Sequence, residues 1–575
     1  MLNPDLLPPE LLKFSQYLDT NYAPSNEEIH IISKLLDGPS SRLEALTLEI
    51  EKLQNELNQK LEEHAALDSQ IAEYRALIKS PIRQVPEDIL REIFVRCLPQ
   101  DHSAPMHSTY TPILLLRICS KWREIAISTP QLWASIHIPI PHATPYYYSQ
   151  DEAEMDDYHT KATETTKKRA TAVDSWLARS GACPLDISLF SYGMIDSTYC
   201  EEIFTVVRKY SMHWKKLDFV CPADCFKTFA SLSPSDVPLL ESLTIKGDNE
   251  GSGTQSFLWS NCGVFEASKL CEVSISQLDE DATSLPFKWA QLTSLTLLKF
   301  GRTRNPPTNR HLFDILRQCV NLVTCRIELP YTPPIVVFIP EDNFSDDPIS
   351  LPLLQNLALN DGGSDITVYL GRLLVPALES FEFFGGSGWS DTLSTKLGPF
   401  LSRVSSTLRT FTTDSKIFVG NAFLDCLRAC THLTSLSMKH LSSYAIPNQA
   451  TSLVKMNDDF LSCFTSPDEN GEYLCPLLET FECRASPAFT DPGLYRFISR
   501  KQSGFVPDIS KLKRVVIPFN RKQVVLLTEE LKTYIEDGFC FDVTYTNSHY
   551  FQTQFSTLDG LPHLQPRLYD SEYYN

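Results

Sequence analysis

One pattern recurs along most of the chain: an apolar residue, nearly always leucine, is followed three and five positions later by residues that are mostly apolar. An example is Leu240-Glu241-Ser242-Leu243-Thr244-Ile245. Eleven such runs begin at residues 214, 240, 270, 292, 322, 354, 378, 408, 433, 478 and 512. Because side chains alternate across a strand, each run predicts a strand with one buried face.

The segments between these runs are helix-like, as in residues 311–317 and 421–427. A strand followed by a helix, repeated, predicts a solenoid with a parallel sheet on one side. The spacing of the runs varies from 22 residues (Leu270 to Leu292) to 45 (Leu433 to Leu478). An ordinary α/β fold is the alternative to a solenoid, and eleven copies of one motif argue against this alternative. The runs resemble irregular leucine-rich repeats, here placed at residues 183–545, with a tail at 546–575.

The N-terminal part predicts a long helix. After a segment at 1–40 that ends in Gly38-Pro39-Ser40, residues 41–79 contain neither proline nor glycine. Ser41 and Glu44 have capping-box spacing. Apolar residues then follow a heptad, interrupted by Lys60 and His64: Leu43, Leu46, Ile50, Leu53, Leu57, Leu67, Ile71, Tyr74 and Ile78. This is typical of a coiled coil. Pairing into a homodimer and packing of one helix on the rest of the chain remain open alternatives.

A second helical block follows at 80–136. Pro86 suits a helix start, and Ile89, Leu90, Ile93 and Phe94 lie on one side of the predicted helix. A further helical stretch runs over residues 113–126, and Thr129-Pro130-Gln131-Leu132-Trp133 closes the block. About fifty residues cannot bury this much apolar surface alone, so some of it is expected at an interface.

This block resembles the F-box. The resemblance is carried by three ordered parts: Val85-Pro86-Glu87-Asp88-Ile89-Leu90-Arg91-Glu92-Ile93-Phe94, then Ile118-Cys119-Ser120-Lys121-Trp122-Arg123-Glu124, then residues 129–133. A preceding coiled coil and following irregular repeats are similar to fungal F-box proteins. The resemblance implies a three-helix module that docks a Skp-type adaptor of a cullin-RING (SCF) ubiquitin ligase, while the repeats bind a protein substrate. The implied adaptor-binding residues are Pro86, Ile89, Leu90, Ile93, Phe94, Cys119, Trp122, Leu132 and Trp133.

Two features depart from the family pattern. Val85 replaces the usual leucine, and the connection from Pro99 to Thr111 is longer than usual. The interface is the favoured role for Pro86, Ile89, Leu90 and Ile93. Packing on the coiled coil or on the first repeats is favoured for Trp133 and Ile136. Residues 137–182 are interpreted as a linker that turns helical from Thr160.

Charge and composition limit the classes of partner that can be expected. The formal net charge is -20, and Lys167-Lys168-Arg169 is an isolated basic cluster, so neither nucleic acid nor an anionic membrane is an expected partner. No signal-peptide pattern and no apolar run of membrane-spanning length is present, which favours a cytoplasmic or nuclear protein. The sixteen cysteines form no CxxC pair, so reduced thiols are expected rather than a zinc site.

No motif for catalysis or a cofactor is recognisable. Phosphate-loop, HExxH and Gly-x-Ser-x-Gly patterns do not occur, so the chain is expected to be no enzyme and to need no cofactor or metal. Three function classes remain: a ubiquitin-ligase substrate receptor, a repeat scaffold with a degenerate F-box, and an enzyme without a recognisable motif. For the substrate, the sequence points to polar strand residues, above all Glu379, Glu382, Glu479 and Glu482, and so to a basic or polar partner.

Overall fold

The computed structural model describes residues 8–79, 82, 85–141, 152–191, 197–221, 223–246, 259–276, 282–298, 309–329, 347–360, 370–385, 392–418, 421–439, 455–469, 471–484, 487–504, 509–519 and 527–545. The expected tail at 546–575 lies outside these residues. The chain divides into two compact units, residues 1–90 and 91–575. Each is described by itself.

The first unit is dominated by one helix, α1 (Asn26–Lys79). It starts earlier than expected: Ser25 and Glu28 form the capping box, with the Ser25 amide donating to Oε2 of Glu28 at 2.8 Å and the Glu28 amide donating to Oγ of Ser25 at 3.4 Å. The expected start at Ser41 was therefore wrong. The helix runs through Gly38 and Pro39, although proline supplies no amide donor to the carbonyl one turn before it.

The second unit is built on a fourteen-stranded sheet in which the strands follow one another in chain order and every neighbouring pair is parallel. The strands are β1 (Ser135–Pro139), β2 (Leu185–Phe190), β3 (Trp214–Val220), β4 (Ser242–Lys246), β5 (Glu272–Ser276), β6 (Ser294–Leu298), β7 (Thr324–Glu328), β9 (Asn356–Asn360), β11 (Ser380–Phe384), β12 (Thr410–Thr413), β13 (Ser435–Met438), β14 (Thr480–Cys483), β15 (Arg514–Phe519) and β16 (Cys540–Tyr545). A separate pair, β8 (Ile349–Ser350) and β10 (Leu373–Leu374), is also parallel.

All eleven runs predicted from the sequence are strands. The sheet is larger than predicted, because β1 and β2 precede the first run and β16 follows the last. It begins at Ser135, within the block assigned to 80–136, so the expected start of the repeat region at 183 was too late. The helix expected within 137–182 is present as α5 (Glu152–Arg179), but it begins before the expected Thr160. The linker part was too long, because β1 extends to Pro139 and α5 covers residues from 152 onwards.

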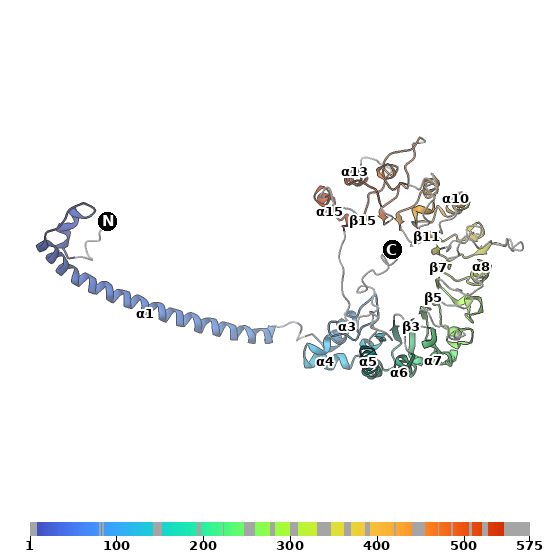
Figure 1. The fold of residues 1–575 in the computed structure, drawn as a ribbon, viewed down its shortest axis with the longest axis horizontal. Coiled ribbons are helices and arrows are strands. Elements are labelled where there is room, and N and C mark those ends of the chain that lie inside the picture. The colour runs from blue at the N-terminus through green and yellow to red at the C-terminus, as the bar shows by residue number, and fades with distance from the viewer. Residues whose placement is uncertain are drawn as a thin grey trace. The chain divides into compact units, whose positions relative to one another are not determined.

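Helices and 3-10 turns connect the strands on one face of the sheet. The α-helices are α6 (Ser197–Arg208), α7 (Lys227–Ala230), α8 (Asn309–Gln318), α10 (Thr392–Val404), α11 (Ala422–Arg428), α12 (Asp458–Ser462), α13 (Asp491–Gln502), α14 (Leu527–Glu530) and α15 (Lys532–Glu536). Within this unit the sheet curves, with its strands on the inner side and the helices on the outer side (Figure 1). A mixed α/β, solenoid-like architecture with a long N-terminal helix is thus established.

The core lies between the sheet and these helices. One register row across the strands holds Leu217, Leu243, Val273, Leu295, Cys325, Leu357, Phe381, Phe411, Leu436, Phe481 and Val515, all buried. Residues of opposite parity face the inner side. This is the arrangement that period-two alternation requires.

Candidate protein-interaction surfaces

The helical block has a different local structure from the one expected. Helix α3 (Glu87–Arg96) forms as predicted. The stretch at 113–126 is interrupted: a 3-10 turn at Leu115–Arg117 ends before α4 (Ser120–Ile127), and a second 3-10 turn covers Pro130–Trp133. Cys119 caps α4, its extended backbone (φ -157°, ψ 170°) breaking the helix and its Sγ accepting from the Trp122 amide at 3.4 Å. A module of three regular α-helices was therefore not found.

Helices α3 and α4 are fixed to each other by ring packing and by one arginine. The rings of Phe94 and Trp122 lie 4.8 Å apart. Nη1 of Arg91 donates to the carbonyl of Ser128 at 3.0 Å and to Oγ1 of Thr129 at 2.8 Å, at the end of α4. A cation is favourable there because the last carbonyls of a helix carry partial negative charge.

The long connection from Pro99 to Thr111 packs against the edge of the sheet. The carbonyl of Ala104 accepts the His137 amide of β1 at 2.9 Å, and Pro105 pairs with His137 in a parallel bridge. Ala104 and Pro105 are buried. The extra length relative to the F-box pattern thus continues the edge of the sheet instead of leaving an open loop.

The nine expected adaptor-binding residues divide into two groups. Leu90, Phe94, Leu132 and Trp133 are at most 2% exposed and belong to the core, so their assignment to an adaptor contact is corrected here. Pro86, Ile89, Ile93 and Cys119 are exposed, and Trp122 is half-buried. Ile89 and Ile93, 49% and 39% exposed, are one helical turn apart on α3 and share a face.

The sequence also left three exposed apolar residues unassigned: Leu114, Ile118 and Ile127. The sequence shows that all three are apolar, but it does not show that they are exposed. Ile118 and Ile127 are 54% and 44% exposed, so the core of the block does not cover them.

The inner face of the sheet is the second candidate surface. Its central row holds Ser188, Asp218, Thr244, Ser274, Thr296, Arg326, Ala358, Glu382, Thr412, Ser437 and Glu482, in register from β2 to β14. The row is small, polar or charged throughout. A surface of this kind suits an extended polar partner better than an apolar one.

Two of the four glutamates expected to bind substrate, Glu382 and Glu482, lie in this row, and Glu379 and Glu479 directly precede β11 and β14. Three of them are already paired: Glu382 with Arg326 at 3.2 Å, Glu479 with Lys513 at 2.7 Å, and Glu482 with Arg484 at 2.5 Å. Among the described residues, no ion-pair partner faces Glu379. The local charge is therefore more balanced than the sequence suggested.

Two carboxyl groups on this face respond differently to burial. Burial raises the pKa of Asp218, and its Oδ1 has no hydrogen-bond partner in the described part of the chain. Burial would also raise the pKa of Glu482, but hydrogen bonds from Arg484 and Ser437 outweigh it and hold that pKa below its usual value. Glu482 is thus a fixed anion, whereas ionisation of Asp218 is disfavoured.

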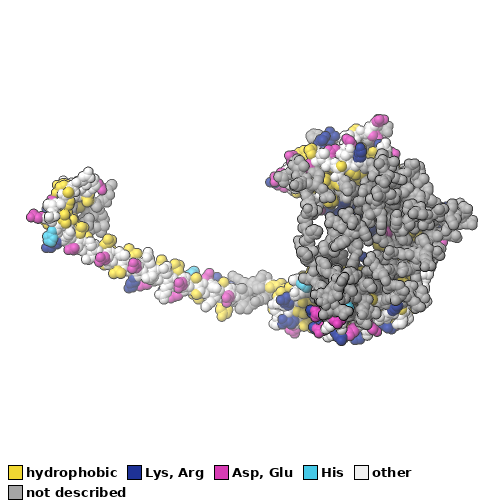
Figure 2. All heavy atoms as spheres, viewed as in Figure 1, with side chains coloured by type: hydrophobic (Ala, Val, Ile, Leu, Met, Phe, Trp, Pro, Cys, Tyr) yellow, Lys and Arg dark blue, Asp and Glu magenta, His cyan; other side chains and the backbone are white. Residues whose placement is uncertain are grey.

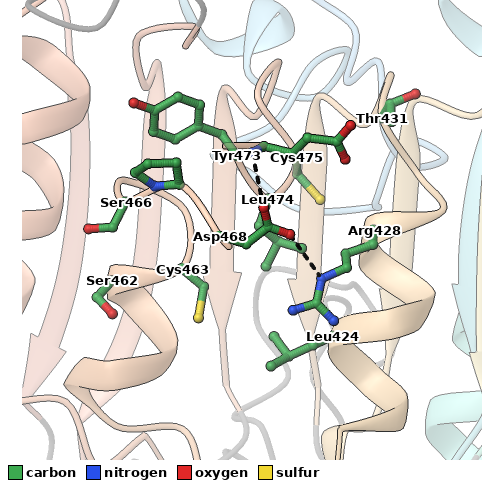
Figure 3. Close-up of a pocket in the computed structure, with 12 residues that line it drawn as sticks. Leu424, Arg428, Thr431, Ser462, Cys463, Ser466, Asp468, Tyr473, Leu474 and Cys475 are labelled. Carbon is green, nitrogen blue, oxygen red and sulfur yellow. Dashed lines mark hydrogen bonds and ion pairs between the residues drawn. The ribbon is translucent and has the colours of Figure 1, made fainter. Parts of the chain in front are cut away.

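A pocket on the helical side offers a third candidate, with a volume of about 200 Å³ (Figure 3). Arg428 of α11 faces Asp468 across it at 3.9 Å and binds Asp425 at 2.7 Å. Burial raises the pKa of the Cys463 thiol in its wall, which disfavours the nucleophilic thiolate. None of the residues lining the pocket is a histidine. The pocket assembles no recognisable catalytic group.

Most of the other described thiols are buried. Burial raises the pKa of Cys262, Cys319, Cys426 and Cys475 to about 12. The two closest cysteine spacings in the sequence are Cys221/Cys225 and Cys426/Cys430, and all four side chains are buried. No cluster of three metal-ligating side chains occurs within the described ranges. No helix there is long and apolar enough to span a membrane.

Comparison with protein-family models gave no match, and comparison with curated proteins gave no similar sequence.

Proposed function

We propose that the chain is a non-catalytic adaptor of the F-box type. In this proposal the block at 80–136 docks a Skp-type adaptor of a cullin-RING ubiquitin ligase, and the leucine-rich-repeat-like sheet holds a protein substrate on its inner face. No cofactor is required, and the protein works in the cytoplasm or nucleus.

The observation that carries the proposal is the division of apolar residues on α3. Leu90 and Phe94 are in the core, while Ile89 and Ile93 remain exposed one turn apart. A single exposed isoleucine needs no explanation, but two on one face, with Ile118 and Ile127 exposed on the same small block, exceed what its core uses. Such a surface fits an apolar docking interface.

The test is binding of a purified Skp-type adaptor to the full chain. Ile89→Asp with Ile93→Asp should weaken binding at least about 10-fold, because two charges would enter an apolar contact. The matched control, Ser242→Asp with Ser294→Asp, adds the same charge to the inner face of the sheet and should leave adaptor binding intact. Unchanged binding in a folded Ile89/Ile93 variant would refute the docking model.

A scaffold that no longer binds an adaptor is the second candidate. It is favoured by the break at Cys119, which divides the middle of the block into a 3-10 turn and a short helix. The same experiment decides between the two: a wild-type chain that fails to bind any Skp-type adaptor, while its inner face still binds a partner, supports the scaffold.

A further inference from the structure

Helix α1 carries an unpartnered apolar seam. Leu43, Leu46, Ile50, Leu53 and Leu57 recur at the first and fourth heptad positions and are 46–67% exposed. The seam continues through Leu67, Ile71 and Tyr74, all exposed. Figure 2 shows these hydrophobic side chains interleaved with acidic ones along the helix. In proteins most of the stability of a helix comes from packing of its apolar face, so a partner that covers this seam is expected.

One flank of this seam is acidic. In three consecutive heptads the position immediately before the first-position residue is a glutamate, namely Glu49, Glu56 and Glu63, all exposed; Arg42 and Gln70 occupy this position in the heptads on either side. Their existing partners lie on α1 itself: Lys52 is 3.8 Å from Glu56, and Lys60 is 2.7 Å from Glu63. Exposed pairs within one helix contribute less than about 1 kcal/mol, so they yield readily to an incoming helix.

A second copy of this chain does not complement that flank. In a parallel pair, Lys60 would face Lys60, His64 would face His64, and Glu63 would lie against Asp68 of the other copy. An antiparallel pair relieves the first two conflicts, since Lys60 then faces Leu57 and His64 faces Leu53. It sets Glu56 against Glu63 at both ends, however, and like charges beside a seam disfavour pairing.

We infer that α1 is a docking helix for a different protein, one that contributes a heptad helix with lysine or arginine beside its own seam. The apolar residues would supply the contact area, and Glu49, Glu56 and Glu63 would select the partner by charge. Lys60 and His64 add a polar layer that fixes the register of that partner, because sliding by one heptad would place them against apolar residues.

The experiment uses two designed four-heptad peptides with leucine and isoleucine in the seam, except for one polar layer opposite Lys60 and His64. One carries lysine at both flanking positions and the other carries glutamate. Each fluorescently labelled peptide is titrated with the full-length chain at low salt, and binding is followed by anisotropy. The basic peptide should bind at least 10-fold more tightly than the acidic one, and added salt should reduce the difference.

Charge reversal supplies the matched pair of variants. Glu49→Lys with Glu56→Lys and Glu63→Lys should invert the peptide preference. Glu44→Lys with Glu51→Lys and Glu62→Lys makes the same change in net charge on the outer side of the helix and should preserve it. Leu53→Asp should abolish binding of the basic peptide, with circular dichroism checking that helix content is retained.

Three outcomes would overturn the inference. The first is that neither peptide binds, and the second is that the two charge reversals have equal effects. The third is that light scattering finds the wild-type chain as a dimer which Ile50→Asp converts to a monomer, because a second copy would then be the occupant.

Discussion

The indole ring of Trp133 lies edge-on to that of Trp176, with 5.0 Å between the ring centroids and 81° between the planes. Trp133 also donates from Nε1 to the carbonyl of Ala126 at 2.9 Å, and the guanidinium of Arg179 sits over its ring at 4.8 Å. These contacts join the end of the helical block to helix α5. Trp133 is therefore a structural anchor of the sheet-bearing unit.

Replacing Trp133 with alanine should destabilise this unit by about 3–5 kcal/mol, the usual cost of removing a fully buried aromatic side chain. Thermal unfolding followed by circular dichroism measures the effect. Ile127→Ala, at a position 44% exposed, is the control and should shift the melting temperature little. Similar shifts for both variants would mean that the Trp133 contacts contribute little.

Lys501 of α13 gives a pH-dependent prediction. Its side chain is buried, its Nζ has no hydrogen-bond partner among the described residues, and burial lowers its pKa to about 8. An unfolded lysine titrates near 10.4, so between about pH 8 and 10 the unfolded chain binds more protons than the folded one. The Lys501 contribution to stability therefore improves as pH rises through this window.

Lys501→Met removes the buried amine while keeping an unbranched side chain. At pH 7 it should stabilise the chain by up to about 3 kcal/mol, and the gain should shrink towards pH 10. Chemical denaturation of both proteins at several pH values measures the difference, in which the titration of the buried cysteines largely cancels. A gain that is independent of pH would show that better packing, not charge, is responsible.

The inner-face glutamates should bind basic peptides weakly and with salt dependence. Reversing Glu379, Glu382, Glu479 and Glu482 to lysine should reduce binding of a labelled arginine-rich peptide. The single change at Glu379 should have the largest effect, because the other three are already paired. If the fourfold reversal leaves both the affinity and its salt dependence unchanged, these glutamates are only exposed to solvent. The loops between strands then become the candidate binding surface.

The pair between Arg326 and Glu382 spans two strands of the same face, with β9 between them. The two side chains are 45% and 19% exposed, so the coupling energy should be below about 1 kcal/mol. A double-mutant cycle with Arg326→Ala and Glu382→Ala measures it. A coupling of several kcal/mol would instead show that the ion pair contributes substantially to the stability of the sheet.

Deletion of residues 1–79 should leave the sheet-bearing unit folded, because residues 91–575 form a compact unit of their own. The melting temperature should change little, and aggregation or loss of a cooperative transition would show that α1 belongs to that core. Light scattering of the full chain should give a monomer, as the charges beside the seam of α1 predict.

The sequence by itself determined the strands. Alternation with period two is a local property, so runs such as Leu240 to Ile245 predicted both the strand and its buried side. The parallel sheet followed from the repetition of strand and helix. Strands β1, β2 and β16 escaped prediction. No leucine stands three residues before Ile136, Ile187 and Phe541, their residues in register with the core row, and their place in the sheet comes from pairing with a neighbour.

Tertiary structure decided which apolar residues of the helical block are core. Ile89 and Leu90 are adjacent in sequence and similarly apolar, yet only Leu90 is buried. Residues one position apart on a helix point about 100° apart, and the sequence does not state which direction is covered. Likewise, Arg326 and Glu382 are far apart in the chain and meet only because irregular repeats bring β7 and β11 into one register. Neutralisation of a charged face depends on that register, which local sequence patterns do not encode.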